Sequence, residues 1–521
     1  MKKTIIIAAA AATLLGVVSC NKENIPNPAE SLQNGTPVRF GMYLPGATKA
    51  GAFGQSSTDF LKGNPTADPA VDNGGFGIFG YYTDNGTYVA DASTGSPINF
   101  MYNQQVRWNG TSWAYTPIKY WPNETGDAAT SRLTDASTYS IDKLSFLAYA
   151  PYVATNASGI PTGAIHNDTT EGILSVSANT DKGDAKITFQ VPARGDQQVD
   201  LLWGVAANNA ANYTDVDGNT VTINPGRPFL DLSKPKFADE EIKFVFKHAL
   251  AKVDFKVQAI VDEATSGDPA IALNDNTKIY LRKIELLGPY AKKAVLNLNN
   301  AGTDGFNDLR SVPKWEFSDS PYEYFNNLTK LNAGDNNNED VKGYIVAYTF
   351  NDNLKDGQEN TAAEANAESD DLNSDETDGV TQGTTGVTAT LKNALKDNRQ
   401  FLIIPTDMTS ETEIIPIASE EGITAPGATK IKDLSYVRVT YDVETADAAL
   451  SQTLTDGTTH GSKIHNVIVR PLNINFEGNK AYTIKLQLGM TSVKVSAEVN
   501  GWEDTAAAQP INLPSNNEAG Q

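Results

Sequence analysis

The sequence predicts an all-β protein with two domains. Short segments of alternating or aromatic-rich residues recur along the chain, and turn signals separate them at regular spacing. Helical periodicity is almost absent. The length of 521 residues is enough for two or three domains. Short, evenly punctuated strands of this kind are typical of β-sandwiches or barrels, so we expect two such domains in tandem.

The first residues are typical of a secretory signal rather than a fold element. Lys2 and Lys3 precede an apolar run, 4–18, that is too short to span a bilayer as a permanent helix. The run ends at Ser19-Cys20, which resembles a bacterial lipobox, where the cysteine is acylated and becomes the first mature residue. We therefore expect a signal peptide over 1–19 and a lipid on Cys20. The alternative is a simple secretory signal with an incidental cysteine.

Residues 20–35 are rich in Asn, Pro and Glu and are expected to form a solvated tether from the lipid to the first strand. The strand expected over 38–44 carries its apolar side chains at every second position, on one face: Val38, Phe40, Met42 and Leu44. A loop of small residues follows, with Lys49 at its centre. Such loops are where proteases cut, although on these residues alone an ordinary, uncut loop is the better interpretation.

The N-terminal domain is predicted over 36–235 and the C-terminal domain over 236–505. Asn109-Gly110 between two aromatic-rich segments is the strongest hairpin signal. Further strands of the two domains are expected at 76–82, 143–152, 187–192, 199–204, 242–257, 280–287, 344–350, 401–405, 437–443, 482–488 and 493–499. An acidic stretch at 351–379 has no alternation and is predicted to be an insertion without regular structure. Residues 506–521 form a C-terminal tail.

The sequence contains no recognisable catalytic or cofactor-binding motif, so we expect neither an enzyme nor a cofactor. The net charge of −22 argues against binding to nucleic acid. The four histidines lack the spacing of a metal site, and none is predicted. Asp215 begins a stretch like a calcium loop, but no glutamate follows at the twelfth position, so a hairpin turn is the better interpretation. Exposed tryptophans and tyrosines around 108–121 are candidates for sugar stacking, yet such pairs are more often core contacts.

Several segments, taken in order, resemble the fimbrillin-like lipoproteins of anaerobic Gram-negative gut and oral bacteria. The segments that carry the resemblance are Phe76–Tyr81, Met101–Val106, Trp113–Pro122, Phe146–Tyr152, Asp196–Leu202, Phe246–Val253 and Val499–Trp502. The resemblance covers most of residues 36–502, and the acidic insertion has no counterpart in it. It implies two transthyretin-like β-sandwich domains and a role as a subunit of a type V pilus.

The resemblance also implies how such a subunit matures. The precursor would reach the outer membrane as a lipoprotein on Cys20. A trypsin-like protease would then remove the first strand, and a neighbouring subunit would fill the emptied groove with a strand of its own. Lys49 is the candidate cut, which would leave Ala50 as the new first residue. Arg39 lies inside the strand and should be shielded. Lysine stands where the family is expected to have arginine.

The tail offers only Ile511 and Leu513 as alternating apolar positions for a donor strand. A donor this short favours an accessory, tip or anchor subunit over the major polymer. The expected partners are other pilus subunits, the outer membrane, and a ligand on a host or bacterial surface. The alternative is a monomeric outer-membrane surface lipoprotein that binds a glycan or another ligand and keeps its first strand.

Overall fold

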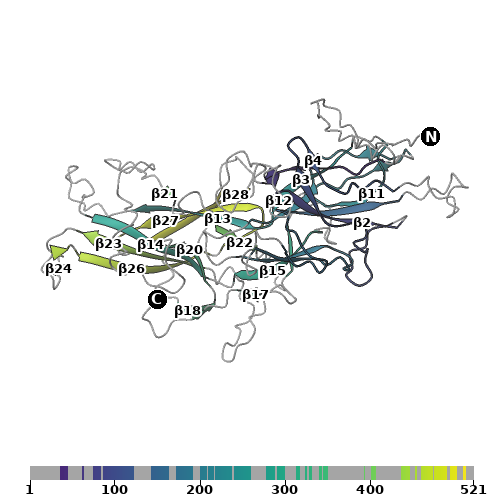
Figure 1. Cartoon of the computed structure of the whole chain (residues 1–521). Helices are drawn as coiled ribbons and strands as arrows, with labels where there is room; N and C mark the ends of the chain where they lie inside the picture. The colour runs from purple at the N-terminus through teal and green to yellow at the C-terminus, as the bar shows by residue number, and fades with distance from the viewer. Residues whose placement is uncertain are drawn as a thin grey trace, which may run out of the picture.

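The structure is a computed structural model of the whole chain (Figure 1). The residues it describes are 36–44, 61–63, 74–83, 86–122, 142–162, 172–191, 200–207, 209–215, 218–236, 240–259, 277–287, 290–299, 313–316, 323–324, 328–330, 340–342, 344–349, 392–393, 401–405, 436–445, 452–453, 459–460, 462–472, 474–489, 493–501 and 509–511. The signal peptide, the tether and the acidic stretch predicted at 351–379 lie outside these residues.

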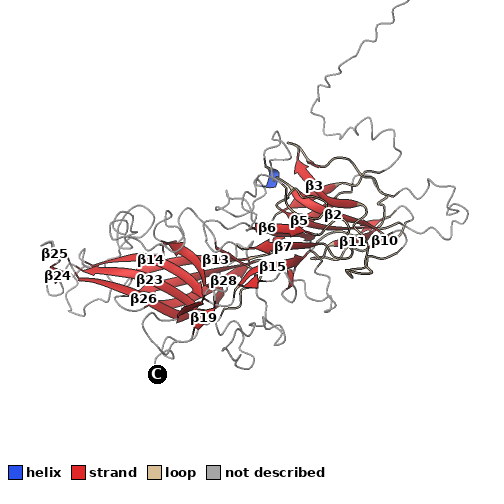
Figure 2. Cartoon of the chain, turned by 60° about the horizontal axis from the view of Figure 1, so that its bottom comes forward, coloured by secondary structure: helices blue, strands red, loops and turns tan. Residues whose placement is uncertain are grey.

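The regular structure of the described residues is strand, apart from a short helical stretch at Leu61 and Lys62, and loops join the strands (Figure 2). The first strands are β1 (Phe40–Tyr43), β2 (Phe76–Tyr82), β3 (Met101–Trp108), β4 (Trp113–Ala114), β5 (Leu144–Ala150), β6 (Gly172–Val176), β7 (Lys186–Gln190), β8 (Leu202–Ala206), β9 (Tyr213–Thr214), β10 (Thr220–Val221), β11 (Phe229–Leu232) and β12 (Ile242–His248). The next are β13 (Ala251–Ala259), β14 (Thr277–Leu287), β15 (Ala291–Asn297), β16 (Lys314–Glu316), β17 (Glu323–Tyr324), β18 (Leu328–Lys330), β19 (Asp340–Lys342) and β20 (Tyr344–Thr349). The last are β21 (Lys392–Asn393), β22 (Phe401–Ile403), β23 (Tyr436–Thr445), β24 (Gln452–Thr453), β25 (Thr459–His460), β26 (Ser462–Pro471), β27 (Lys480–Leu488), β28 (Val493–Gly501) and β29 (Gln509–Ile511).

An eight-stranded sheet dominates the N-terminal half. Its order is β1-β12-β8-β5-β2-β3-β4, and β11 is added on β5. Both faces of this sheet are covered: Phe146 and Ala148 of β5 belong to one core, whereas Leu147 and Tyr149 belong to another. Burial on both faces explains why β5 is a continuous apolar run in the sequence rather than an alternating one.

A second sheet, β16-β15-β7-β6 with β17 added on β15, covers one face of the eight-stranded sheet. Its strand β15 comes from residues after 235, yet it pairs with β7 from Lys293↔Gln190 to Asn297↔Lys186. Strand β12 likewise pairs with β8. Strand pairing therefore crosses the division predicted at residue 235, and that boundary stays a prediction.

Two further sheets enclose the core of the C-terminal half. One has the order β21-β13-β27-β28-β29 with β22 added on β13, and the other has the order β20-β14-β23-β26. Their facing side chains form a single cluster that includes Phe255, Ile284, Val439 and Ile484. The all-β prediction is confirmed, and the two stacked pairs of sheets agree with tandem sandwiches. In the views of Figures 1 and 2 the two halves lie end to end.

The chain passes from one half to the other at the end of β12, where several groups hold the backbone. The Nδ1 atom of buried His248 lies 2.9 Å from Oδ2 of buried Asp200. The N–H of Ala249 donates to the carbonyl of Leu201 (2.8 Å), and the carbonyl of Ala249 accepts from the indole N–H of Trp315 (2.9 Å). These bonds hold this short stretch between the two sheets of the N-terminal half. His248 thus has a structural role here, buried and in contact with Asp200.

Two predicted turns are confirmed. β3 and β4 pair as a hairpin across Asn109-Gly110, and Gly110 has a φ of 101°, which favours glycine. β9 and β10 pair around the Asp215 turn, where the carboxylate of Asp215 accepts from the backbone N–H and the side-chain amide of Asn219. Its Oδ2 also accepts from the hydroxyl of Ser233, so both carboxylate oxygens of Asp215 are hydrogen-bonded within the protein.

Over the described part of the chain, no group of three or more His, Cys, Asp or Glu is placed to hold a metal ion. Nor does any helix found there have the length and hydrophobicity to cross a membrane.

Among the described residues of the C-terminal half, the carboxylate of Glu285 on β14 is buried, with 1% exposure, on the face of its sheet opposite the core residues Ile284 and Leu286. Arg438 on β23 donates to both of its oxygens, over 2.6 and 2.8 Å, and the ammonium of Lys283 lies 2.8 Å away. Burial raises the pKa of Glu285, but the hydrogen bonds and charges of Arg438 and Lys283 outweigh it, so the pKa lies below its ordinary value.

Arg438→Met should destabilise the C-terminal half by about 3 kcal/mol at neutral pH, because it leaves a buried carboxylate with one partner. Since the folded pKa of Glu285 is lowered, the ion pair stabilises the wild type above the unfolded pKa of about 4.3 and is lost as the pH falls through the folded pKa. Urea unfolding of both proteins at several pH values measures this. A difference between them that does not shrink at acid pH would contradict the assignment. Lys283→Met serves as a control: Lys283 is more exposed than Arg438, so its loss should destabilise the protein less.

Candidate functional site: the groove that holds the first strand

The first strand lies at the edge of the eight-stranded sheet and runs parallel to β12. Its register is Phe40↔Ile242, Gly41↔Lys243, Met42↔Phe244 and Tyr43↔Val245, and the N–H of Ile242 donates to the carbonyl of Arg39 over 2.9 Å. β1 ends the strand order, with β12 as its one ladder partner in the sheet. Because β12 is paired with β8 on its other side, removal of β1 would expose only the β1-facing edge of β12.

The residues just before β1 pair with a second segment, on the edge of the strand that is opposite β12. The N–H of Val38 donates to the carbonyl of Lys119 (2.9 Å), and the N–H of Trp121 donates to the carbonyl of Thr36 (2.8 Å). These two bonds flank the bridge between Pro37 and Tyr120. The missing N–H of Pro37 therefore falls where no ladder bond is needed, which explains why a proline is tolerated there.

The hydroxyl of Tyr115 stabilises the pairing of residues 36–38 with residues 119–121. It donates to the carbonyl of Val38 over 2.7 Å, and it accepts from the N–H of Lys119 over 3.2 Å. Without the first strand, the Tyr115 hydroxyl, the Lys119 carbonyl and the N–H groups of Trp121 and Ile242 would all lose a partner. Each buried group left unsatisfied costs about 1–3 kcal/mol, so the empty groove strongly favours another extended backbone.

The side chains of the first strand fill an apolar groove. Val38, Phe40 and Leu44 are buried, and Met42 is half-buried against the same cluster. Phe40 stands at the centre of an aromatic group, with ring centroids 5.5 Å from Tyr115, 5.2 Å from Phe146 and 6.3 Å from Phe244. The four alternating residues of the predicted removable strand therefore share one buried face. Whether the strand is removed stays a prediction.

The alternate residues of the strand face outward. Arg39 is half-buried and its carbonyl is bonded to Ile242, which agrees with the expectation that a protease would not reach it. A Cβ at Gly41 would lie 3.1 Å from Oε2 of Glu241 and 3.3 Å from Cγ of Lys243. Tyr43 is 60% exposed. Lys49, Ala50 and Cys20 lie outside the described residues.

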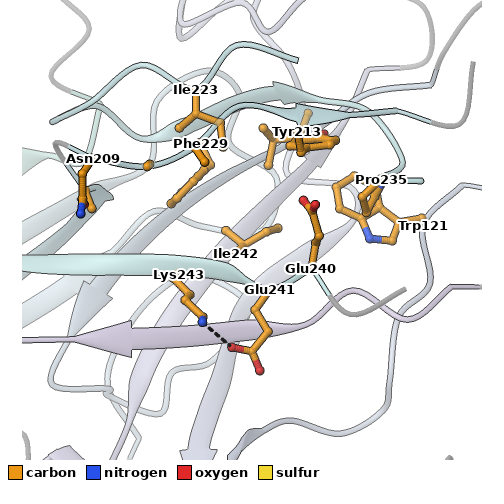
Figure 3. A pocket seen from close by; sticks show the side chains of 14 residues that line it. Trp121, Asn209, Tyr213, Ile223, Phe229, Pro235, Glu240, Glu241, Ile242 and Lys243 are labelled. Atoms are coloured by element: carbon orange, nitrogen blue, oxygen red, sulfur yellow. Dashed lines mark ion pairs between the residues drawn. The ribbon is translucent and has the colours of Figure 1, made fainter. Parts of the chain in front are cut away.

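A pocket of about 270 Å³ opens at the beginning of β12, beside Trp121 of the segment that pairs with residues 36–38 (Figure 3). Its walls include Trp121, Tyr213, Phe229 and Ile242, and Glu240 points into it between Tyr213 and Trp121. Burial raises the pKa of Glu240 above the ordinary value of a glutamate. We refer to it below as the β12 pocket.

The aromatic residues considered for sugar stacking are mostly engaged inside the protein. Trp113 packs edge-on against Phe76, with 5.4 Å between the ring centroids, and Trp121 is 4% exposed. Trp108 packs against Trp113 and carries the ammonium of Lys62 at 5.1 Å from its ring centroid. These contacts match the core interpretation.

The tail lies at the edge of the C-terminal sheet. β29 pairs antiparallel with β28, with Ile511 opposite Ala497 and Gln509 opposite Val499. Leu513 lies outside the described residues. The candidate donor segment is thus joined to its own C-terminal half, away from the groove of the same chain.

Sequence reasoning missed the residues that receive the first strand. Tyr115, Lys119 and Trp121 bind its backbone, and Glu240 lines the neighbouring pocket, yet no local pattern relates them to residue 38. The only available signal was the cluster of aromatic residues and prolines at 113–122, which is unusually dense for an ordinary loop.

Phe40→Ala should destabilise the N-terminal half by about 3–5 kcal/mol, because it opens a cavity among three aromatic rings. Tyr43→Ala, on the exposed side of the same strand, should change stability by about 0.5 kcal/mol or less. Urea unfolding followed by tryptophan fluorescence compares the two. Equal effects would show that the groove does not hold the strand through its inward face.

The chain matches no known family model. It is similar in sequence to the fimbrium subunit Fim1C of Phocaeicola vulgatus, with 23% identity over 443 residues that cover 83% of this chain and 83% of that protein. Its structure aligns with that of a fimbrial protein from Bacteroides vulgatus over 89% of this chain and 99% of that one, with 19% identity and a TM-score of 0.47. A candidate cell adhesion protein from Bacteroides uniformis aligns over 89% and 98%, with 12% identity and a TM-score of 0.32. The sequence relative confirms the predicted resemblance to fimbrial proteins and, with it, the prediction that the chain is not an enzyme.

Proposed function

We propose that this chain is a fimbrial subunit in cell adhesion and that it assembles by exchange of its first strand. A protease would cut after Lys49, the strand and its lipid on Cys20 would leave, and a strand of another subunit would fill the groove. The observation that carries the proposal is the position of β1. It is a terminal strand, inserted beside β12 through four register pairs, over a groove of aromatic side chains.

The energetics support replacement rather than simple loss. Burial of Val38, Phe40 and Leu44 stabilises the protein by about 1.5–3 kcal/mol for each side chain. An empty groove loses this burial free energy and leaves backbone groups without hydrogen bonds, so it is unstable. A strand with the same alternation of apolar residues restores both the burial and the hydrogen bonds.

The tail of a second copy has part of the required pattern. Gln509-Pro510-Ile511-Asn512-Leu513 repeats the arrangement of Thr36-Pro37-Val38-Arg39-Phe40, with proline in second place and apolar residues in third and fifth. Pro514 would then stand at the position of Gly41, where a parallel ladder with β12 needs an N–H. The match ends there. A donor this short supports an accessory, tip or anchor subunit, held at the outer membrane by Cys20 when it is uncut.

The alternative, a monomeric surface lipoprotein that binds a glycan, receives no comparable support. The described aromatic residues once considered for sugar stacking face other side chains of the protein.

The mature N-terminus tests the cut. In protein taken from the surface of the native cell, mass spectrometry should find Ala50 as the first residue. Lys49→Ala should abolish this end and leave lipidated Cys20, whereas Arg39→Ala, at the half-buried basic residue of the strand, should be processed normally. A first residue at Phe40 would contradict the assignment of Lys49. Lipidated Cys20 alone in the wild type would contradict removal of the strand.

A disulfide lock tests the exchange itself. Tyr43 and Val245 are register partners on adjacent strands, at a separation that suits a disulfide between Tyr43→Cys and Val245→Cys. The oxidised double variant should retain the first strand after cleavage and fail to polymerise, and reduction should restore assembly. Each single variant serves as a control that assembles in both conditions. Polymerisation of the oxidised double variant would contradict the strand-exchange proposal.

A further inference from the structure

The β12 pocket stays open while the first strand is in place. Phe40 is paired with Ile242, so a strand that continued straight along β12 would bring residue 38 opposite Glu240. The register with β12 begins only at Phe40, however, and no residue of the first strand lines the pocket. The part of the groove beside Glu240 is therefore not used by the resident strand.

Two polar groups at this pocket lack a partner among the described residues. The indole Nε1 of Trp121 is buried without an acceptor. Glu240 is exposed at the rim; its carboxylate points into the pocket, and partial burial raises its pKa. Its neighbour Glu241 differs, because its Oε2 lies 3.8 Å from the ammonium of Lys243. The buried donor favours a ligand that brings an acceptor, and the carboxylate at the rim is placed to attract a cation.

The walls of the pocket fit an aliphatic or aromatic stem. Tyr213, Ile223, Phe229 and Ile242 surround a volume of about 270 Å³, which admits one large side chain. Lysine and arginine bury their methylene stems on such surfaces while the charged end reaches an acid, and their cations are attracted to aromatic faces. With two glutamates and one lysine at its rim, the pocket carries a net negative charge that complements a cation.

We propose that the β12 pocket binds a lysine or arginine side chain of the incoming strand, at the position that runs opposite Glu240. The cation pairs with the Glu240 carboxylate, the stem lies against Tyr213 and Ile242, and a backbone carbonyl of the same strand accepts from the indole of Trp121. Because the pocket is open beside a filled groove, this contact forms first and selects which subunit strand replaces β1. The identity of the ligand as a strand rests on the proposed function.

The pocket is tested first without any strand exchange. The full-length chain, labelled with ¹⁵N in its six tryptophan indoles, is titrated with Nα-acetyl-lysine methylamide and with the neutral Nα-acetyl-norleucine methylamide. The lysine amide should shift the Trp121 signal, assigned by its loss in Trp121→Phe, and Glu240→Gln should weaken binding about tenfold. Glu241→Gln, at the carboxylate already paired with Lys243, should have a smaller effect. Equal binding of the two amides, no binding, or no effect of Glu240→Gln would overturn the proposal.

Peptides then test the strand. Two peptides with the sequence of residues 36–44, carrying lysine or norleucine in place of Val38, are added to the full chain after cleavage behind Lys49. The wild type should capture the lysine peptide faster than the norleucine peptide. Glu240→Gln should capture the two peptides at the same rate. Equal capture would overturn the role of the pocket in strand selection. If neither peptide is captured, strand exchange itself fails and the strand is excluded as the ligand, while the amide titration still reports on the pocket.

Discussion

The backbone edge of β12 is the constraint on which the N-terminal half depends. β12 buries Ile242, Phe244 and Phe246 on one face, and the backbone N–H and C=O groups along its two edges each need a neighbouring strand. β8 satisfies one side, and β1 the other through a short parallel register. A parallel partner cannot arrive through a tight turn, and β1 comes from about 200 positions earlier in the chain. The strand that completes this edge of the sheet thus comes from a distant part of the chain.

This arrangement joins the proposed assembly and the pocket in one place. The first strand meets β12 only from Ile242 onward and is held before that by Tyr115, Lys119 and Trp121. Because the first strand pairs with β12 only from Phe40 onward, no residue of that strand lies beside Glu240 in the ladder. A strand from another subunit, free of the tether to Cys20, need not begin its pairing at that point. The same geometry that holds the resident strand therefore leaves room for a competitor.

Much of the fold could be predicted because it depends on local patterns. The alternation at Val38, Phe40, Met42 and Leu44 identified the buried face, and Asn109-Gly110 identified a hairpin. The parallel partner of β1 could not be predicted, because nothing in residues 38–44 specifies β12 over another apolar strand. The pairing of β15 with β7 across the predicted boundary and the convergence of Trp121, Tyr213 and Glu240 are likewise long-range, and no sequence spacing encodes them.

The far end of β12 gives the fold a mechanical property. Its last residue, His248, contacts Asp200, and the following Ala249 is bonded to Leu201 and Trp315, so β12 is anchored where the chain enters the C-terminal half. The resident strand lies parallel to β12, and we expect a strand that replaced it in the same direction to inherit that geometry. Tension along that strand would load the ladder bonds together, in shear, and pass through β12 into the next half. A filament built this way would resist pulling along its axis better than peeling at the strand's end.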